Sequence, residues 1–367
     1  MSDMMELTVD LGARSYPIYI GQGIIDNIGA FFEKHGLGKN SPHLVVTDEH
    51  VAEHHLPRVL GLLGEAGYKV SPYTVNAGEK SKSLAVLEDV VGVALDAGLD
   101  RKSSIIALGG GVVGDLAGFV AASYMRGIRF VQIPTTILAH DSSVGGKVAV
   151  NHPKAKNIIG AFHQPEMVLY DTSTLQTLPP RDVRAGLSEM IKHGLIWDSE
   201  FTAWCEDNAD KLVGLDPEAL QYGLYQGCKV KSIVVSQDEK ENDLRAILNL
   251  GHTIGHALEA VAGYNELVHG EAISIGMVGA AKLAVQLGYS EDIYTVTKRI
   301  LQKFGLPTRC PEHLDTDRIM EAMMHDKKFS GGNMVYIVPT AIGKVEIRKD
   351  VKPEWVRNIV EQLKRED

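Results

Sequence analysis

The sequence predicts an N-terminal α/β domain built on a parallel sheet and a C-terminal domain that is mainly α-helical. The chain has 367 residues, which favours two domains at about 100–200 residues each. In the first half, short runs of β-branched and apolar residues alternate with helical patterns, as parallel strands buried on both faces do. The clearest runs are residues 44–47, 104–108, 130–133 and 167–170, and the alternating segment 7–20 predicts an antiparallel hairpin or edge.

The pattern changes at the Pro179–Pro180 pair. Beyond it helical periodicity dominates, and the clear strand candidates are residues 333–339 and 344–348. A Pro-Pro pair is a typical boundary between elements. We therefore expect the two domains to comprise residues 1–179 and 180–367.

Composition excludes several functional classes. Apolar residues make up 44% and charged residues 23%, as in ordinary globular proteins. The net charge of −10 gives no basic field for nucleic acid. Three widely spaced cysteines argue against a disulfide framework. The N-terminus shows no signal peptide, and the apolar stretch 272–285 is too short to cross a bilayer. We expect a cytoplasmic protein without nucleic-acid or membrane partners.

A glycine-rich turn follows one predicted strand and precedes a helix expected at residues 115–124. Gly109, Gly111 and Gly114 match the GxGxxG pattern, whose glycines let backbone N–H groups approach a pyrophosphate. The usual fingerprint also has an acidic residue about 20 positions later, and none stands there. Asp48, at the end of another strand, could instead meet a ribose hydroxyl. The motif alone leaves a phosphate-binding turn and a structural turn both open.

Residues 244–259 are expected to form one helix that is apolar on most faces and carries a polar stripe. At about 100° per residue, the side chains on this stripe are Arg245, Asn249, His252, His256 and Glu259. A buried polar stripe needs partners, which a ligand, a metal or another helix could supply. His252 and His256 have the i, i+4 spacing that can bring two imidazoles to one metal, but hydrogen-bonded core histidines share this spacing.

Two further segments extend this candidate metal site. His269 follows closely in the sequence, at the expected start of another helix. A helix expected at residues 182–197 carries Glu189 and Lys192 on one face. Glu189 could supply an oxygen ligand to a His-His-Glu zinc site. The alternative is a simple i, i+3 ion pair between Glu189 and Lys192.

The segment 134–165 is expected to form polar loops at the carboxyl end of a strand, where α/β sheets bind ligands. Positive charges gather in and just before it, at Arg126, Arg129, Lys147, Lys154 and Lys156. They favour a pocket for a phosphate or carboxylate. A solvated loop surface is the alternative.

Together these motifs resemble those of the 3-dehydroquinate synthase family of the shikimate pathway. The matching segments are Gly109-Gly-Gly-Val-Val-Gly-Asp115, Tyr124-Met-Arg-Gly127, Pro134-Thr-Thr136, Asp141-Ser-Ser-Val-Gly-Gly-Lys147, Lys156-Asn157, Glu189-Met-Ile-Lys192, Asn249-Leu-Gly-His252, His256, His269-Gly-Glu271 and Asp326-Lys-Lys328. They run in family order through roughly residues 45–345. Many members have one more residue where this chain has Ile137-Leu-Ala-His140, which leaves the local position of His140 open.

The resemblance implies a Rossmann-like NAD-binding domain, a helical metal- and substrate-binding domain, an active site in the cleft between them, and a homodimer. It implies a divalent metal, usually zinc with cobalt as an alternative, on Glu189, His252 and His269, so that His256 faces the substrate. The implied NAD contacts are Asp48, Glu79, Lys82, Gly110, Gly111, Asp115, Thr135, Thr136 and Thr177. The implied catalytic residues are Arg126, Lys147, Asn157, Lys192 and His256. Further substrate contacts are Asp141, Lys156, Lys231, Arg245, Asn249 and one of Lys327 and Lys328.

The family reaction converts 3-deoxy-D-arabino-heptulosonate 7-phosphate, an anionic sugar acid phosphate, into 3-dehydroquinate and phosphate on the way to chorismate and the aromatic amino acids. It is a lyase reaction in which NAD transiently oxidises a hydroxyl, phosphate leaves by β-elimination, the ketone is reduced again, and an intramolecular aldol step closes the ring. His256 is the candidate for proton transfer. The intact segment 144–147 favours this enzyme over related sugar phosphate cyclases.

Two other functional classes remain open from the sequence. A metal- and NAD-dependent polyol dehydrogenase would share the glycine turn and the histidines, but it does not need so many cations around an anionic substrate. A non-catalytic NAD-sensing or scaffold protein would not need a set of metal-ligand types beside a cationic pocket. Turnover of the heptulosonate phosphate, compared with oxidation of glycerol, separates the three.

Overall fold

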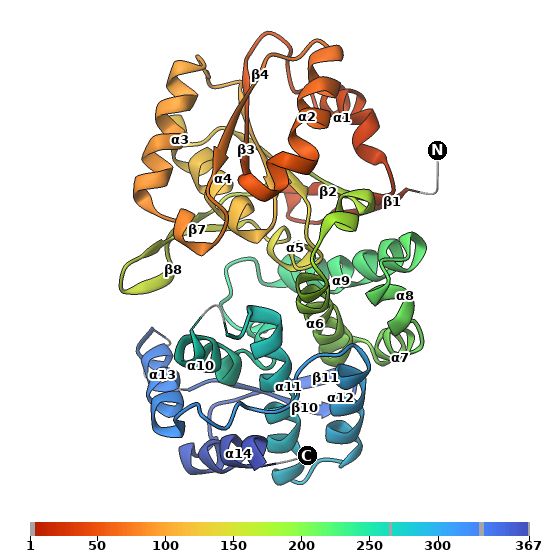
Figure 1. Ribbon diagram of the computed structural model, residues 1–367, viewed down its shortest axis with the longest axis vertical. Coiled ribbons are helices and arrows are strands. Elements are labelled where there is room, and N and C mark those ends of the chain that lie inside the picture. The colour runs from red at the N-terminus through yellow and green to blue at the C-terminus, as the bar shows by residue number, and fades with distance from the viewer. Residues whose placement is uncertain (1–3, 264–265, 330–333, 366–367) are drawn as a thin grey trace. The chain divides into compact units, whose positions relative to one another are not determined.

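The computed structural model describes residues 4–263, 266–329 and 334–365 and divides the chain into two compact units (Figure 1). Unit 1 comprises Met1–Leu178 and Leu220–Lys240, and unit 2 comprises Pro179–Ala219 and Glu241–Asp367. The chain first passes from unit 1 to unit 2 between Leu178 and Pro179, at the Pro-Pro pair. Most of helix α9 (Pro217–Gln237) groups with unit 1, where Lys231 forms an ion pair with Asp141. A division into functional domains at residue 179 stays a prediction.

Unit 1 is built on a seven-stranded sheet in the order β1-β2-β9-β6-β5-β3-β4. The strands are β1 (Met5–Val9), β2 (Tyr16–Gly21), β3 (His43–Asp48), β4 (Val70–Val75), β5 (Ser104–Gly109), β6 (Arg129–Pro134) and β9 (Met167–Asp171). β1 pairs with β2 in antiparallel fashion, and the other neighbouring strands pair in parallel. The predicted parallel sheet and its N-terminal antiparallel hairpin are confirmed.

Helices cover both faces of this sheet (Figure 1). Apolar residues of α1 (Ile28–Lys34) and α2 (Glu49–Glu65) share one core with the strands, and those of α3 (Leu84–Asp96) and α4 (Gly111–Ser123) share another. The adjacent strands β3 and β5 are therefore followed by helices on opposite faces. The carboxyl ends of two such strands mark the place where open α/β sheets bind ligands.

Short helical segments complete unit 1. They are η1 (Gly12–Arg14), η2 (Ile24–Asn27), η3 (Glu79–Ser81), η4 (Tyr124–Arg126), α5 (Ala139–Ser142) and η5 (Thr172–Thr177). Several of them follow the carboxyl ends of parallel strands, so they lie at the edge of the sheet where ligands are expected.

The prediction of loops throughout residues 134–165 was wrong. β7 (Lys147–His152) and β8 (Ala155–Phe162) form a two-stranded antiparallel hairpin. Val148 and Val150 are buried in the core that α4 shares with the sheet. This tertiary contact makes one face of the hairpin apolar. The glycines and lysines of the segment hide that alternation in the sequence.

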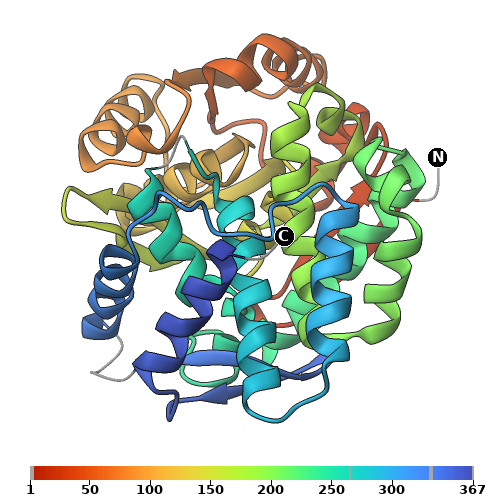
Figure 2. The same ribbon diagram turned by 60° about the horizontal axis from the view of Figure 1, so that its bottom comes forward.

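Unit 2 is mainly helical, as predicted, and its central helix is α11 (His269–Gln286). The other elements are α6 (Pro180–Trp197), α7 (Ser199–Asp207), α8 (Ala209–Val213), α10 (His252–Ala262), α12 (Asp292–Lys303), α13 (Thr316–Phe329), α14 (Pro353–Arg365) and the antiparallel strands β10 (Tyr336–Ala341) and β11 (Lys344–Arg348). α11 packs against α6, α10, α12, α14 and β10, and Figure 2 shows it between α12 and α14. Among the described residues, no helix has the length and apolar character needed to cross a membrane.

The prediction of one continuous helix over residues 244–259 was also wrong. The segment forms a 3-10 helix, η6 (Leu244–Asn249), and then α10, which begins at His252. Gly251 between them has a φ of +79°, a left-handed conformation that ends a helical register. A Cβ on Gly251 would lie 2.7 Å from the backbone nitrogen of Met277. Arg245 and Asn249 therefore do not continue the polar stripe of α10.

The buried carboxylate of Asp171 at the end of β9 generates a first prediction. It accepts backbone N–H groups from Gly23, Ile25 and Ser173 at 2.8, 3.0 and 2.9 Å. Since hydrogen bonds to charged groups contribute about 1.5–3 kcal/mol, Asp171→Ala is expected to lower the free energy of unfolding by about 3 kcal/mol in urea titrations. Ser83→Ala, which removes the acceptor of one N–H group of α3, should cost about 1 kcal/mol. Equal losses from both variants would contradict this account.

Candidate active site

The candidate NAD contacts of unit 1 lie at the carboxyl edge of its parallel sheet. Asp48 is the last residue of β3, and the others follow β4 (Glu79 and Lys82), β5 (Gly110, Gly111 and Asp115), β6 (Thr135 and Thr136) and β9 (Thr177). Because the carboxyl ends of parallel strands meet at one edge, the topology brings together residues that are more than a hundred positions apart in sequence. No single sequence motif contains them all.

The glycine turn between β5 and α4 is shaped by its protein neighbours. A Cβ on Gly110 would lie 2.8 Å from the Thr136 methyl carbon, and one on Gly111 would lie 3.1 Å from the Ser142 hydroxyl. The glycines thus allow the chain after β6 to approach the start of α4. The first N–H groups of α4 have no partner within the helix, so this end suits an anion. Asp48 caps α2 through one carboxylate oxygen, which accepts two backbone N–H groups.

Lys82 joins candidate NAD contacts to a candidate substrate contact. Its side chain is 4% exposed, and its ammonium donates to Asp115 at 2.7 Å and to the side-chain oxygen of Asn157 at 2.5 Å. The carboxylate of Glu79 is 3.7 Å from the same ammonium. Burial raises the pKa of Asp115, and the charge of Lys82 opposes this rise. The four residues form one charged network.

Asn151 belongs to this network and was missed by sequence reasoning. Its amide nitrogen donates to Glu79 at 2.8 Å, and its side-chain oxygen accepts the backbone N–H of Asn157 at 2.8 Å. Its own backbone N–H donates to the Lys82 carbonyl. Asn157 has a φ of +53°, a strained conformation that asparagine tolerates better than most residues. The only signal in the sequence was an asparagine just before a His-Pro turn.

The remaining candidate substrate contacts of unit 1 lie on η4, α5, α9 and the β7–β8 hairpin. Lys231 of α9 forms an ion pair with Asp141, with 3.1 Å between ammonium and carboxylate. Lys147 begins β7 and is exposed, as is Lys156 on β8. Arg126 is exposed at the end of η4, with a φ of +69°. Of these cations, Lys231 lowers the pKa of Asp115 in the network of Lys82, and Lys156 adjoins Asn157 in the chain.

In unit 2, three helices bring together a carboxylate and two imidazoles. Glu189 lies in the middle of α6, and His252 and His269 are the first residues of α10 and α11. One donor atom from each lies within 4.8 Å of the others, and among the described residues this group could hold a metal ion. The Glu189 Oε1 atom is 3.7 Å from His252 Nε2 and 3.3 Å from His269 Nε2. Tetrahedral zinc, with bonds of about 2.0–2.2 Å, places its donors about 3.3–3.6 Å apart, and the two distances from Glu189 are close to this spacing.

The second ring nitrogen of each histidine is held by the protein. His252 Nδ1 is 3.1 Å from the Leu250 carbonyl, and His269 Nδ1 is 3.2 Å from the Glu259 carboxylate. Metal-binding histidines usually have such partners, which orient the ring. Burial lowers the pKa of His252 well below its usual value. Burial also lowers the pKa of His269, but hydrogen bonds to Glu189 and Glu259 outweigh it and raise that pKa to about 9.

Lys192 and His256 lie beside the three donors. Lys192, 1% exposed, forms an ion pair with Glu189, so the i, i+3 pair and the candidate metal site share the same carboxylate. The His256 ring lies 5.0 Å from the His252 ring, but His256 is outside the group of three. Arg245 is fully buried, and Asn249 donates to Glu241 at 3.2 Å. The side chains of Lys327 and Lys328 lie outside the described residues.

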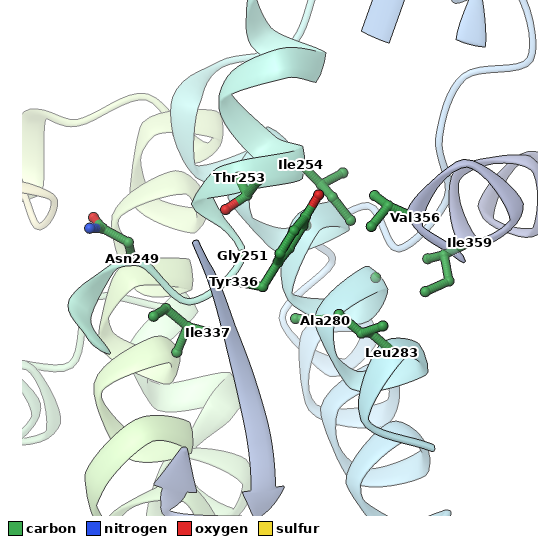
Figure 3. A pocket seen from close by; sticks show the side chains of 12 residues that line it. Asn249, Gly251, Thr253, Ile254, Ala280, Leu283, Tyr336, Ile337, Val356 and Ile359 are labelled. Atoms are coloured by element: carbon green, nitrogen blue, oxygen red, sulfur yellow. The ribbon is translucent and has the colours of Figure 1, made fainter. Parts of the chain in front are cut away.

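A small cavity lies between the turn that precedes α10, helix α11 and strand β10 (Figure 3). Its volume of about 20 Å³ has room for about one water molecule. Gly251, Tyr336 and Ile337 are among its lining residues, and the Asn249 amide points away from Tyr336 in Figure 3. The cavity is too small for a sugar phosphate, so it is a packing feature of unit 2 and no substrate site.

An α/β unit with a ligand-binding sheet edge and a helical unit with a His-His-Glu group that could hold a metal ion suit the class of nucleotide- and metal-dependent enzymes. Comparison with known proteins narrows this class. Family models of the 3-dehydroquinate synthase N-terminal and C-terminal domains match residues 72–185 and 186–329. The chain belongs to the 3-dehydroquinate synthase family and has 3-dehydroquinate synthase activity.

Curated relatives agree over nearly the whole chain. The 3-dehydroquinate synthase of Desulforamulus reducens is 50% identical over 98% of this chain and 100% of its own length. That of Pelotomaculum thermopropionicum is 48% identical over 96% of this chain and 95% of its own length.

Solved structures share the whole fold. A 2-deoxy-scyllo-inosose synthase complexed with carbaglucose-6-phosphate, NAD+ and Co2+ has a TM-score of 0.89 at 27% identity, over 98% of this chain and 99% of its own. The 2-epi-5-epi-valiolone synthase of Streptomyces hygroscopicus, with NAD+ and Zn2+ bound, has a TM-score of 0.87 at 26% identity, over 95% and 96%. An iron-containing alcohol dehydrogenase from Thermococcus thioreducens, 18% identical over 96% of this chain and 99% of its own with a TM-score of 0.71, shares the fold alone.

The arrangement of histidines generates a second prediction. His252→Ala and His269→Ala are each expected to lose tightly bound zinc, because each removes one of three protein donors. His256→Ala should keep the metal and lose activity by about 100- to 10,000-fold, the range expected for a group that transfers protons. Metal content of the dialysed variants gives the first result, and steady-state rates give the second. Loss of metal from His256→Ala with retention in His269→Ala would reverse the assignment.

Proposed function

We propose that this chain converts 3-deoxy-D-arabino-heptulosonate 7-phosphate into 3-dehydroquinate and phosphate as an NAD- and metal-dependent lyase. The observation that carries the proposal is the group of Glu189, His252 and His269 with Lys192 against it. This group occurs in a chain about half identical to named 3-dehydroquinate synthases over nearly its full length. When bound, NAD accepts and returns a hydride, and the divalent metal polarises the substrate oxygen.

The residues of unit 2 then hold the metal and the reacting part of the substrate. Glu189 supplies a carboxylate oxygen, and His252 and His269 supply their Nε2 atoms. The Leu250 carbonyl and the Glu259 carboxylate keep both rings in the required orientation. His256 lies beside the donors and moves a proton at its ring during the oxidation and reduction steps. Lys192 orients a substrate oxygen near Glu189.

The residues of unit 1 bind NAD. Asp48 meets a ribose hydroxyl, the start of α4 binds the pyrophosphate through backbone N–H groups, and Glu79, Lys82, Thr135, Thr136 and Thr177 line the same edge. Lys82 contacts both Asp115 and Asn157. The network therefore aligns the cofactor with the substrate turn at residues 156–157. Such positioning can supply much of the rate.

The cations favour a sugar acid phosphate as the substrate. Arg126, Lys147, Lys156, Lys231 and Arg245, with one of Lys327 and Lys328, bind its phosphate and carboxylate together with Asp141 and Asn249. A polyol dehydrogenase has no need of so many cations. This difference favours the lyase over a dehydrogenase that would use the same fold and metal donors.

The metal, the assembly and the compartment complete the proposal. Zinc is the expected metal, with cobalt as an active substitute, because neighbours of this fold hold one or the other. A homodimer follows from the family resemblance and is tested by light scattering. Cytoplasmic localisation is supported by three buried free cysteines, which suit a reducing compartment.

A third prediction separates the lyase from a dehydrogenase. With purified protein, a divalent metal and trace NAD, phosphate release should exceed the added NAD many-fold, because NAD is regenerated in every turnover. No net NADH should remain, and deuterium at the oxidised carbon should stay in the product. The measurements are a phosphate assay, absorbance of NADH and mass spectrometry of the product. Accumulation of one NADH per product, or oxidation of glycerol without phosphate release, would replace the proposal with a dehydrogenase.

A further inference from the structure

Helix α6 and the first turn of α11 meet along a row of three contacts. On α6 the contacting positions are spaced by four residues, so they lie on one face of the helix. On α11 they are three consecutive residues. In order along α6, the contacts are Arg181 with Glu271, Ala185 with Gly270, and Glu189 with His269. The last contact joins two candidate metal ligands, and the first two determine how α11 approaches them.

The first contact is a bidentate ion pair with additional hydrogen bonds. Arg181 donates from Nε to one oxygen of Glu271 at 2.8 Å and from a terminal nitrogen to the other at 2.6 Å. The same terminal nitrogen donates to the Glu266 carbonyl at 2.6 Å, and Glu271 accepts the Val268 N–H at 3.1 Å. The start of α6 is thus connected to the chain on both sides of His269. Bidentate Arg–carboxylate pairs restrict geometry more than single contacts do.

The second contact leaves no space between the two backbones. A Cβ on Gly270 would stand 2.1 Å from the carbonyl oxygen of Ala185. The helices therefore touch directly, and this contact acts together with the ion pair one turn away to fix the first turn of α11. Because any side chain at Gly270 would disrupt this packing outright, the ion pair is the better position for a test.

We propose that Arg181 and Glu271 are positioning residues for the metal centre. They hold the first turn of α11 so that His269 Nε2 stays 3.3 Å from Glu189 Oε1, and this inference rests on the proposed function. The pair contacts the segment around His269 but supplies none of the three donor atoms. Glu271 ends the His-Gly-Glu segment of the sequence, and the proposal gives this residue a role that metal ligation does not explain.

The test compares two Arg–Glu pairs of unit 2 in the full-length protein. Arg181→Ala and Glu271→Gln are expected to weaken zinc affinity by about 10- to 100-fold, as removal of contacts that orient metal ligands does. Affinity is measured by competition with a chromophoric chelator. In the cobalt form, the visible absorption should shift because the donor geometry changes. The affinity loss should appear in kcat/KM when zinc is limiting and largely disappear at saturating zinc.

The matched control is Arg299→Ala. Arg299 also forms a bidentate pair, with Glu206 at 2.6 and 2.9 Å. The exposure of the two side chains, 55% and 19%, resembles the 46% and 17% of Arg181 and Glu271. This variant should lose similar thermal stability and keep wild-type zinc affinity and the wild-type cobalt spectrum.

Each other outcome decides against the proposal. Unchanged zinc affinity in both Arg181→Ala and Glu271→Gln, with tight binding by the wild type, would overturn the positioning role and leave the metal centre intact. Equal losses of zinc affinity in Arg181→Ala and Arg299→Ala would mean that the Arg181–Glu271 pair only stabilises the fold. A wild-type chain that binds neither zinc nor cobalt would overturn the metal centre itself, and this inference with it.

Discussion

The helical unit must accommodate a carboxylate that is almost completely removed from water, and much of its arrangement follows from that constraint. Glu189 is 1% exposed, and an isolated buried carboxylate is costly unless cationic or hydrogen-bonding partners surround it. Lys192 supplies a charge from the next turn of the same helix. Two imidazoles arrive from the first residues of two other helices. A divalent cation is a further partner that suits this group.

Because the imidazoles come from helix ends, their positions depend on how closely the helices approach. Gly270 lets α11 touch α6, and a Cβ on Gly276 would stand 1.9 Å from the Gly251 carbonyl oxygen in the turn before α10. Backbone contacts of this kind leave little freedom for sliding, since no flexible side chain lies between the helices. The donor distances are therefore a property of the packing of three helices.

In the α/β unit, the order of the parallel strands brings distant residues together. Its candidate contacts are scattered from Asp48 to Thr177, but each follows the carboxyl end of a parallel strand. The buried Lys82 then ties together Asp115, Glu79 and Asn157. One ammonium between carboxylates and an amide is stable in a buried place because its charge is compensated from several sides. The same network connects the candidate NAD contacts Glu79 and Asp115 with Asn157 on β8 of the β7–β8 hairpin.

Local sequence patterns predicted the elements in which burial gives the apolar residues a regular spacing. Continuous apolar runs predicted the parallel strands, and helical periodicity predicted α6 and the helical second half. The patterns failed where long-range contacts decide. The β7–β8 hairpin was predicted as a loop because its apolar face depends on α4. The helix predicted at 244–259 is interrupted at Gly251, which packs directly against α11.

The sequence by itself determined the fold class, the types of chemical group available and, through the family motifs, the reaction. Only the tertiary structure decided which groups meet. Spacing alone left a metal-binding pair of His252 and His256 open, and the family motifs implied Glu189, His252 and His269 as ligands. The structure shows that donor atoms of these three residues lie within 4.8 Å of one another. The partners Glu259 and Asn151 also emerged only from the folded chain. The physical reason is that periodicity reports which face of an element is buried. The distances between donors on different elements depend on how closely those elements pack, which no local pattern contains.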